Sequence, residues 1–519
     1  MNALLSIILS VFLLSSAFAQ SAPTDSVSVA DLGIYGDGQT EQSDTIQAVL
    51  DSYSRIYFPP GRYAIDKSLN LRNNHHISGT DSTVFLATGE AATAEKFSFV
   101  TLSSVEKVRL DRLTFYANDH PKRRIYAVAG RNVHGLTLKH LKVYNAGVVQ
   151  LQEKRGYSYA KVPSDLSSEA FRQVGNSALE VTQCHGEGSQ YTIPRTTAVY
   201  INYTDGWKVT QSSFTRYHQG VRWWGGDSDT RRDGALANVR KCRNGLVSEV
   251  QSSYIHGGGI WGSMGEDITV QHCQVSHCQD VGIDFEGCFR SKAINNYVAE
   301  CKNGNLAVFF FNKDITFTNN QSVQSNPNYR HACIYNASQR QDNGKVVFDQ
   351  NTFSSTQGVG KIEQRGPSRQ IIFTQNSLQN VVVNFSFNNN KQITVQNNTF
   401  LITRPLTHYD FLLKAGQTHR GGKINIEGNH LLTTVPQADN VYAISLYQSD
   451  YNSSPVNRVI NNYVSGLSRV VKTEWAGKNA GFRATTYVES EASLSPEAIK
   501  KIDVGARSSK LYVNDKEQK

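Results

Sequence analysis

The sequence predicts an all-β protein built as a parallel β-helix, in which short strands stack coil upon coil. Apolar, β-rich runs that end in Asn-rich turns recur at intervals of about 22 to 30 residues between residues 134 and 488, and a second short strand follows each run. Coils of this length cannot bury their own apolar faces, so stacked neighbours must complete the core. Clear examples lie at residues 268–273, 293–297, 315–320, 346–351, 371–376, 393–398 and 424–429.

Asparagine suits the turns of such a solenoid because it tolerates a left-handed backbone and can hydrogen-bond along a ladder of coils. A β-propeller is the structural alternative for a repetitive all-β chain. Propeller repeats are longer and their strands are antiparallel, so we favour the solenoid.

The first residues carry the pattern of an export signal. The apolar run from Leu4 to Ala19 ends in the small-residue cleavage pattern Ala17-Phe18-Ala19, which predicts a signal peptide at residues 1–19. The run is short for a membrane span, and no later segment is long enough for one. We therefore expect a secreted or periplasmic protein, mature from about Gln20, with no membrane span.

Residues 20–90 are expected to form a leader and an N-terminal cap. The turn-rich segment GIYGDGQT at 33–40 precedes an amphipathic helix at 44–51, and RIYFPPGRYAI at 55–65 predicts a strand, a turn and a second strand. In this order the three features resemble the N-terminal cap of pectate-lyase-like right-handed β-helix proteins. The resemblance implies a right-handed solenoid, a short capping helix and carbohydrate-active chemistry.

The β-helix itself is expected to span residues 91–490. Two irregular stretches interrupt it, a long polar insertion near 153–197 and a charged loop near 225–237. Insertions on a solenoid usually cluster on one face and often line the binding site. Residues 491–519 are expected to form a tail with a short C-terminal helix, which resembles the "AGL-x-P" closing segment of many β-helix proteins.

Composition limits the class of partner. The chain has 519 residues and a formal charge of +9, which suits an acidic partner such as an anionic polysaccharide. Because no basic stripe and no nucleic-acid motif appear, nucleic acid is not expected. Seven cysteines are an odd count and too few for a disulfide scaffold. Cys278 and Cys301 fall at equivalent positions of adjacent coils, where they either pair or stack as buried thiols. The oligomeric state stays open.

The segment QDVGIDFEG at 279–287 is the strongest candidate for catalysis. In a strand, Asp284 and Glu286 share one face and their apolar neighbours share the other. Acidic residues are depleted in strands, so this pair favours a functional site over a solvated surface. One carboxyl can protonate the leaving oxygen of a glycosidic bond while another acts as base or nucleophile. We expect Glu286 to be the acid and Asp284 or Asp280 the base, in an inverting mechanism.

Stacking the second strands of successive coils predicts a sugar-binding groove beside these acids. The residues aligned inward are Val221, Ile260, Ile283, Val308 and Ile334. Their outward neighbours lie on coils about 4.8 Å apart, and flat aromatic faces beside carboxylates suit a sugar chain. The alignment also points Phe311 outward. The predicted substrate-binding residues are Arg222, Trp224, His256, Trp261, Phe309, Lys313, Arg330 and Tyr335.

The corner beside this groove raises the question of a metal. His218, His256 and Asp280 precede matching turns of successive coils. They come from different coils and lack the tight spacing of a zinc site, so no metal and no other cofactor is predicted. The alternative is a Ca²⁺ ion held by the oxygens of Asp280, Asp284 and Glu286.

The acidic segment also bears on the family within the superfamily. QDVGID at 279–284 is similar to the "N-T-D-G-I-D" motif of polygalacturonases, with a spacing that differs by one residue. The paired aspartates of that family are missing, because the equivalent coil reads NLAVFFF at 305–311, and its downstream "R-I-K" is missing too. Galacturonan as the substrate therefore does not follow.

The favoured prediction is a secreted glycoside hydrolase that degrades a polysaccharide. The first alternative is a polysaccharide lyase, which needs a base and a cation to neutralise a uronate. Cationic or basic side chains near the patch and the positive net charge favour the lyase. The second alternative is a non-catalytic carbohydrate-binding β-helix, which predicts aromatic residues without an acid pair. Because Asp284 and Glu286 lie beside Trp261, an enzyme is favoured over a binding protein.

Overall fold

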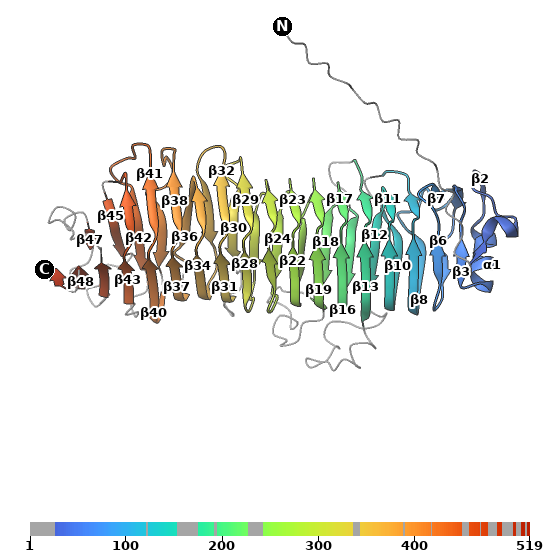
Figure 1. Cartoon of the computed structure of the whole chain (residues 1–519), viewed down its shortest axis with the longest axis horizontal. Coiled ribbons are helices and arrows are strands. Elements are labelled where there is room, and N and C mark those ends of the chain that lie inside the picture. The colour runs from blue at the N-terminus through green and yellow to red at the C-terminus, as the bar shows by residue number, and fades with distance from the viewer. Residues whose placement is uncertain are drawn as a thin grey trace, which may run out of the picture.

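A computed structural model shows the chain as a parallel β-helix (Figure 1). It describes residues 26–120, 123–152, 175–190, 195–226, 242–335, 343–387, 390–416, 418–448, 456–467, 469–475, 485–489, 502–504, 510–513 and 516–518. The strands stack along the long axis of the molecule, with α1 (Ser43–Ser52) at one end and β48 (Lys510–Val513) near the other. The predicted fold class is confirmed, while the predicted C-terminal helix lies outside the described residues.

Each regular coil contributes one strand to each of three faces. Faces 1 and 2 belong to one 33-stranded sheet, and face 3 is a separate 16-stranded sheet. The long strands β8 (Lys96–Asp111) and β10 (Arg124–Lys139) run across faces 1 and 2. Face 1 contains β5 (Leu69–Leu71), β12 (Gly147–Gln152), β15 (Thr197–Asn202), β18 (Gln219–Trp224), β21 (Ile260–Ser263), β24 (Val281–Glu286), β27 (Gly304–Phe309), β30 (Arg330–Tyr335), β33 (Gly360–Gln364), β36 (Val381–Phe385), β39 (Phe411–Gly416), β42 (Tyr442–Gln448), β45 (Arg469–Trp475) and β47 (Ile502–Val504).

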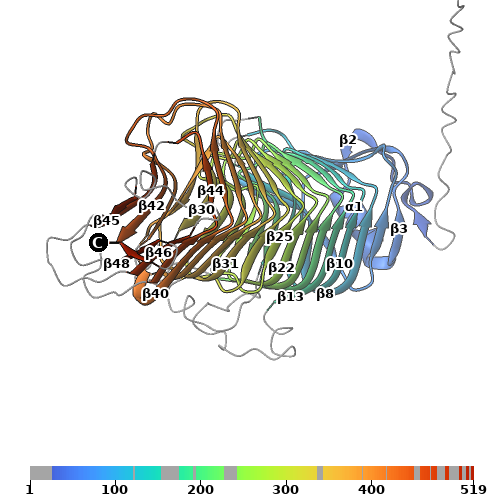
Figure 2. The same ribbon diagram turned by 60° about the vertical axis from the view of Figure 1, so that its left-hand side comes forward.

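Face 2 lies around the corner from face 1, and several of its strands appear side by side in Figure 2. Its strands are β1 (Val27–Ser28), β3 (Arg55–Tyr57), β6 (His76–Ser78), β13 (Asn176–Thr182), β16 (Thr204–Thr210), β19 (Cys242–Ser248), β22 (Gly265–Gln271), β25 (Lys292–Ile294), β28 (Ile315–Thr318), β31 (Asn343–Asp349), β34 (Ser368–Thr374), β37 (Asn390–Gln396), β40 (Thr418–Glu427), β43 (Val456–Ile460), β46 (Thr485–Glu489) and β48, which pairs antiparallel with β49 (Lys516–Gln518).

Face 3 runs along the upper edge of the molecule in Figure 1. Its strands are β2 (Asp37–Glu41), β4 (Gly61–Ile65), β7 (Thr83–Ala87), β9 (Thr114–Tyr116), β11 (Lys142–Tyr144), β14 (His185–Glu187), β17 (Ser213–Thr215), β20 (Gln251–Ser253), β23 (Gln274–Ser276), β26 (Tyr297–Ala299), β29 (Gln321–Gln324), β32 (Thr352–Ser355), β35 (Ser377–Gln379), β38 (Thr399–Ile402), β41 (His430–Thr433) and β44 (Tyr463–Ser465).

The N-terminal end is closed as the sequence predicts. A 3-10 turn, η1 (Val29–Leu32), leads into β2, and α1 follows it. Ile46, Val49 and Leu50 of α1 are buried, so the helix covers the apolar end of the first coils, which would otherwise face water.

The interior is a continuous apolar stack with aromatic rings at its centre. Trp223 packs against Phe285 with ring centroids 5.8 Å apart, and Phe285 packs against Phe317 at the same distance. These three side chains are fully buried. Since Phe285 belongs to β24, the stack fixes the strand that carries the predicted catalytic carboxylates.

The corner between faces 2 and 3 has the same length in every regular coil. It consists of two residues, from Arg112 and Leu113 to Asn461 and Asn462. The first residue has a positive φ, for example 56° at Asn295. The second is buried in each coil up to Asn429 and half-buried at Asn462. Asn and Gly adopt the left-handed conformation more readily than most residues, which explains the polar turn motif of the repeats.

The second residue of this corner forms a buried asparagine ladder in the C-terminal coils. Each side-chain amide nitrogen donates to the side-chain oxygen of the next coil, at 2.9 Å from Asn296 to Asn320 and at 3.0 Å from Asn320 to Asn351. The ladder continues through Asn376, Asn398, Asn429 and Asn462. The predicted ladder is present, but the left-handed residue and the ladder residue are two different positions.

The seven cysteines are all buried free thiols. Cys278 and Cys301 stack in adjacent coils. The hydrogen bond between their thiols and, next, burial raise the pKa of Cys278 well above its usual value. Of the two arrangements that the sequence leaves open for this pair, the structure shows stacked thiols.

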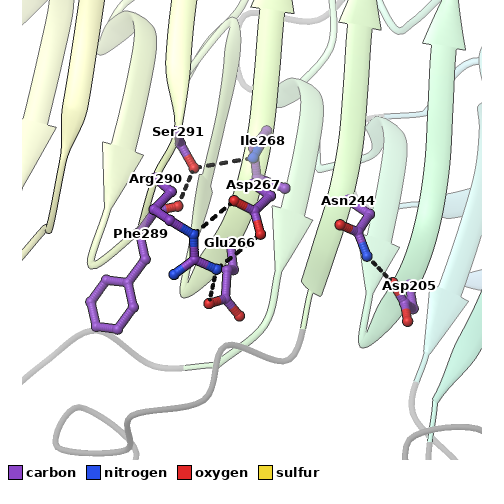
Figure 3. Close-up of polar contacts among 8 residues, drawn as sticks. All are labelled: Asp205, Asn244, Glu266, Asp267, Ile268, Phe289, Arg290 and Ser291. Carbon is purple, nitrogen blue, oxygen red and sulfur yellow. Dashed lines mark hydrogen bonds and ion pairs between the residues drawn. The ribbon is translucent and has the colours of Figure 1, made fainter. Parts of the chain in front are cut away.

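The corner between faces 1 and 2 varies in length. A single residue, Met264, joins β21 to β22, whereas the segments 153–175 and 225–241 join β12 to β13 and β18 to β19. Both predicted insertions therefore begin at this corner, although most of their residues lie outside the described ranges. Next to them, Arg290 bridges Glu266 and Asp267 of the preceding coil (Figure 3). This ion-pair cluster ties β22 to β25 at the corner.

Candidate functional site

The predicted carboxylates lie on the outer side of β24. Ile283 and Phe285 of that strand are fully buried in the core, so the alternate residues Asp284 and Glu286 point away from it. The shared face of the two acids is as predicted. The degree of exposure differs from that expected for an open groove, because Asp284 is only 1% exposed and Glu286 is half-buried.

The surroundings of Asp284 favour its protonated form. Burial raises the pKa of its carboxyl well above the usual range, and the negative charges of Glu286 and Asp280 raise the pKa further. A hydrogen bond from the backbone of Phe285 acts in the opposite direction. A buried carboxyl beside two other acids keeps its proton because the charged form loses hydration and is repelled.

Asp280 lies at the turn before β24 and is the third acid of the cluster. It is half-buried, and its Oδ1 accepts a hydrogen bond of 2.7 Å from Nδ2 of Asn303 in the next coil. The carboxyl is therefore held in one orientation and stays within electrostatic reach of Asp284.

A cation and aromatic rings lie beside the acids in the outer row of face 1. The register places Tyr200 next to Arg222, Arg222 next to Trp261, and Trp261 next to Asp284. The Arg222 guanidinium carbon lies 5.0 Å from the Tyr200 ring centroid, 4.4 Å from that of Trp224 and 4.9 Å from that of Trp261. Three rings thus hold this cation two strands from Asp284.

Gln219 holds Trp261 in place. Its Oε1 accepts hydrogen bonds from Nε1 of Trp261 at 2.6 Å and from the backbone N–H of Gly258 at 2.7 Å. The side chain is largely buried, and a Cβ added at Gly257 would collide with it. The role of Gln219 could not be predicted from the sequence, because its partner lies one coil away. The glycine run at 257–259 is the only signal for it in the sequence.

Several buried polar atoms of the site have no hydrogen-bond partner within the described residues. They are Nε of Arg222, Oγ of Ser263 and Oδ1 of Asp284, which lie on three successive strands. Ser263 is fully buried and lies next to Glu286 in the row that follows. Native proteins leave few buried polar atoms unsatisfied, and each such atom calls for a partner such as water, an ion or a ligand.

His256 lies at the edge of face 1, as predicted, and stacks near His218 with ring centroids 5.7 Å apart. Burial lowers the pKa of His218, and the nearby charges of His256 and Arg222 lower it further. His218 is therefore neutral at neutral pH, and one of its ring nitrogens, Nδ1, has no partner in the described residues.

The register beyond β24 corrects the predicted alignment. Leu306, not Val308, lies beside Ile283, and Ala307 lies beside Asp284. A two-residue slip keeps every side chain on its predicted face, so the alternating pattern alone does not detect it. Phe309 still lies outward, beside Glu286, and is followed by Tyr335 with ring centroids 5.3 Å apart.

Three predicted outward residues lie elsewhere or are engaged otherwise. Phe311 is buried at 3% exposure with Met264, because the chain has already turned the corner. Lys313 is exposed at that corner with Nζ 4.5 Å from the Phe289 ring centroid, so it lies past the end of face 1. Arg330 stays on face 1, where its Nε lies 2.6 Å from Oε2 of Glu363.

The described part of the chain offers no ready metal site, since no three His, Cys, Asp or Glu side chains there are arranged to hold an ion. This applies to Asp280, Asp284 and Glu286, which the sequence analysis considered as Ca²⁺ ligands. None of the described helices combines the length and apolar character needed to cross a membrane. Two hollows, of about 490 Å³ and 540 Å³, lie on other parts of the solenoid.

Comparison with known proteins supports the fold and adds a family. Residues 26–304, more than half of the chain, match the family model described as rhamnogalacturonase A/epimerase, pectate lyase-like. That range includes Arg222, Trp261 and the three acids. No curated protein matches the chain in sequence.

Solved structures share the architecture at low sequence identity. Gene product 12 of bacteriophage phi29 is 12% identical, with 89% of this chain and 68% of that chain covered and a TM-score of 0.52. The mannuronan C-5 epimerase A-module of Azotobacter vinelandii is 12% identical, with 87% and 100% covered and a TM-score of 0.47. An α-1,3-glucanase catalytic unit from Streptomyces thermodiastaticus is 11% identical, with 95% and 71% covered and a TM-score of 0.37.

Proposed function

Because the chain belongs to the rhamnogalacturonase A/epimerase, pectate lyase-like family, we propose that it is a glycoside hydrolase that cleaves a polysaccharide at the carboxylates of β24. Members of this β-helix family act on carbohydrates, and the choice among hydrolysis, elimination and epimerisation is the part that we propose. In keeping with its predicted signal peptide, we propose that the enzyme works outside the cytoplasm.

The burial of Asp284 beside two other acids, which raises the pKa of its carboxyl, carries this proposal. A carboxyl that keeps its proton at neutral pH can protonate the leaving oxygen of a glycosidic bond. Asp284 is therefore the general acid in our mechanism. This exchanges the roles expected from the sequence, where Glu286 was the acid, because Asp284 is almost fully buried whereas Glu286 is half-buried.

Glu286 is then the base that activates water, with Asp280 as the other candidate for this role. Residues two apart on a strand have Cα atoms about 6.5 to 7 Å apart. A carboxyl separation of about 6.5 to 9.5 Å leaves room for a water molecule and gives inversion at the anomeric carbon. The product is expected to have inverted configuration.

The rings around Arg222 orient the sugar beside the acids. Trp261 lies next to Asp284 in register, and Gln219 fixes its indole. Flat aromatic faces stack on the apolar faces of sugar rings, so Trp261 and Trp224 form one side of the binding surface. Phe309 and Tyr335 form the other side, beyond Glu286.

A panel of polysaccharides tests the reaction class. Reducing ends report hydrolysis, and ultraviolet absorbance of unsaturated products reports elimination. Hydrolysis predicts reducing ends without absorbance, a loss of about 10²- to 10⁴-fold in Asp284→Asn and Glu286→Gln, and no effect of a chelator. Glu249→Gln is the matched control, since Glu249 is an exposed acid at the corner between faces 2 and 3.

A polysaccharide lyase is the second candidate. It is favoured by Nε of Arg222, which has no hydrogen-bond partner among the described residues. A guanidinium can neutralise the carboxylate of a uronate before proton abstraction. Unsaturated products that survive Asp284→Asn but vanish in Arg222→Gln would replace the hydrolase by this reaction. Absorbance that vanishes with chelator would instead make the acids a Ca²⁺ site that serves a lyase.

A further inference from the structure

A second cluster of charged and aromatic residues lies on face 1, far from the acids. The outer row that contains Asp284 continues through Ala307, Cys333, Glu363 and Asn384 to Lys414. It then passes Ser445 and Lys472 on β42 and β45. Since neighbouring coils are about 4.8 Å apart, Lys414 lies five strands, or about 24 Å, from Asp284.

Aromatic rings fix the two lysines of this cluster. Nζ of Lys414 lies 5.6 Å from the Phe411 ring centroid and 4.9 Å from that of Tyr447. Nζ of Lys472 lies 5.4 Å from the Tyr442 ring centroid. Lys414, Tyr447 and Lys472 are half-buried, so their polar ends are near the surface while their stems are packed.

Ser445 lies between the two lysines in register. It is 1% exposed, and its buried Oγ has no hydrogen-bond partner in the described part of the chain. The residues that flank it in the strand, Ile444 and Leu446, are core residues, so the serine points outward. A hydroxyl donor between two ammonium groups suits one class of ligand, an oxyanion.

We propose that Lys414, Ser445 and Lys472 form a second binding site, which takes a carboxylate or sulfate group of the polysaccharide chain. The proposal rests on the proposed function in that the ligand is part of the same polymer. A chain that lies along face 1 would reach from Trp261 to this anion site without leaving the outer row. The site thereby gives the enzyme a preference for long, charged polymers.

Acidic neighbours set the strength of this site. Oδ2 of Asp410 lies 3.9 Å from Nζ of Lys472. Between the two sites, Glu363 is already neutralised by Arg330 at 2.6 Å. The anion must compete with Asp410 for Lys472.

Binding is measured in the Asp284→Asn variant, so that the polymer is not cleaved. The probes are two matched pairs, polygalacturonate with its methyl ester and dextran sulfate with dextran, run by affinity electrophoresis. The charged member of at least one pair should bind more tightly than its neutral partner. Lys414→Ala and Lys472→Ala should each weaken that binding about fivefold or more. Ser445→Asp, which adds a carboxylate between the lysines, should abolish the preference.

Lys292→Ala is the charge-matched control, because Lys292 is exposed on face 2. If Lys292→Ala and Lys414→Ala weaken the binding of charged polymers equally, the effect is one of net charge and the proposed site is wrong. Equal binding of charged and neutral polymers would overturn it as well.

Tighter binding of polygalacturonate identifies a carboxylate as the ligand, and tighter binding of dextran sulfate identifies a sulfate. Unchanged cleavage of short oligosaccharides in Lys414→Ala separates this site from the catalytic one. A failure of cleavage with intact anion binding would contradict only the proposed reaction.

Discussion

The corner between faces 2 and 3 is built in two ways along one molecule. In the coils nearer the N-terminus its buried residue is apolar or has a small polar group, and from the coil of β25 onward it is asparagine. The first set is Leu113, Leu141, Cys184, Ser212, Val250 and Cys273. The second set is Asn296, Asn320, Asn351, Asn376, Asn398, Asn429 and Asn462.

The two regions also differ in how they treat buried polar groups. In the C-terminal region the ladder asparagines have both amide nitrogen and oxygen bonded to neighbouring coils. In the N-terminal region Arg222, Ser263 and Asp284 keep buried atoms without partners among the described residues. The family model covers the region of these unpartnered atoms and ends at residue 304. The asparagine ladder thus satisfies its polar atoms within the fold, whereas the neighbourhood of the acids does not. Single unpartnered atoms such as Oγ of Ser445 also occur among the described residues of the C-terminal region.

Cutting the ladder in its middle is expected to have the largest effect on stability. In Asn376→Leu, the carbonyl of Phe348 and the side chains of Asn351 and Asn398 lose partners at 3.0, 3.0 and 2.9 Å. Each buried group left unpaired costs about 1 to 3 kcal/mol, so we expect a loss of about 3 to 5 kcal/mol in urea unfolding. Val250→Ala, the matched change in the apolar corner, should cost less, and equal losses would erase the distinction between the regions.

The buried histidine of the C-terminal region predicts acid sensitivity. His331 is fully buried between the hydroxyls of Ser322 and Ser355, each 2.9 Å away, and burial lowers its pKa to about 3. The unfolded chain, with a pKa of about 6.5, binds the proton first. The stabilising contribution is therefore complete above about pH 6.5 and falls by up to about 1.4 kcal/mol per unit as the pH drops towards 3. Urea midpoints between neutral pH and about pH 5 measure this fall, which should be absent in His331→Gln.

In the N-terminal region, the hydrogen bond between Trp261 and Gln219 predicts an effect on substrate binding. Gln219→Leu removes the acceptor of the Trp261 and Gly258 hydrogen bonds, so the indole loses its fixed orientation. We expect KM to rise about tenfold, as for a lost hydrogen bond of about 1 to 1.5 kcal/mol, with kcat little changed and the tryptophan emission shifted. Gln219→Glu keeps an acceptor and should restore KM. If the two variants behave alike, Gln219 is not a positioning residue.

The buried acid Asp284 of the same region predicts a gain in stability from an inactivating change. The folded pKa of Asp284 is raised above the unfolded value, so its favourable contribution is complete only below the unfolded pKa and is lost as the pH rises through the folded pKa. Asp284→Asn removes this penalty, and its Tm should exceed that of the wild type at neutral pH. The difference should vanish at acid pH, and a lower Tm at neutral pH would contradict the raised pKa of Asp284.

Extending the asparagine ladder by one coil is expected to have the smallest effect on the free energy of unfolding. The Cys273 backbone N–H already donates to Oδ1 of Asn296 at 2.9 Å, so an asparagine at 273 finds a partner in place. Cys273→Asn should change the free energy of unfolding by less than about 1 kcal/mol. Val250→Asn, one coil further, has no asparagine above it and should be clearly destabilising. Similar costs at both positions would show that the ladder does not propagate coil by coil.

Much of this fold was predictable because its rules are local. The cap, the repeats and the outward direction of Asp284 and Glu286 follow from order and from alternation along a strand. The N-terminal corners lack the asparagine that marks a turn in the sequence, so the repeats are clearest in the C-terminal region. Contacts between coils determine the features that could not be predicted. These are the two-residue shift at Leu306, the burial of Asp284 and the hydrogen bond by which Gln219 fixes Trp261. Alternation within one strand carries no information about those contacts.

The constant two-residue turn between faces 2 and 3 keeps the spacing of the coils regular along the molecule. Segments of very different length join face 1 to face 2, yet the pitch from coil to coil is set at the opposite corner and does not change. Loops at the variable margin can therefore be exchanged or lengthened during evolution while Asp284 and Lys414 keep their separation. New specificities can therefore arise at this corner while the spacing of the sites along the solenoid stays constant.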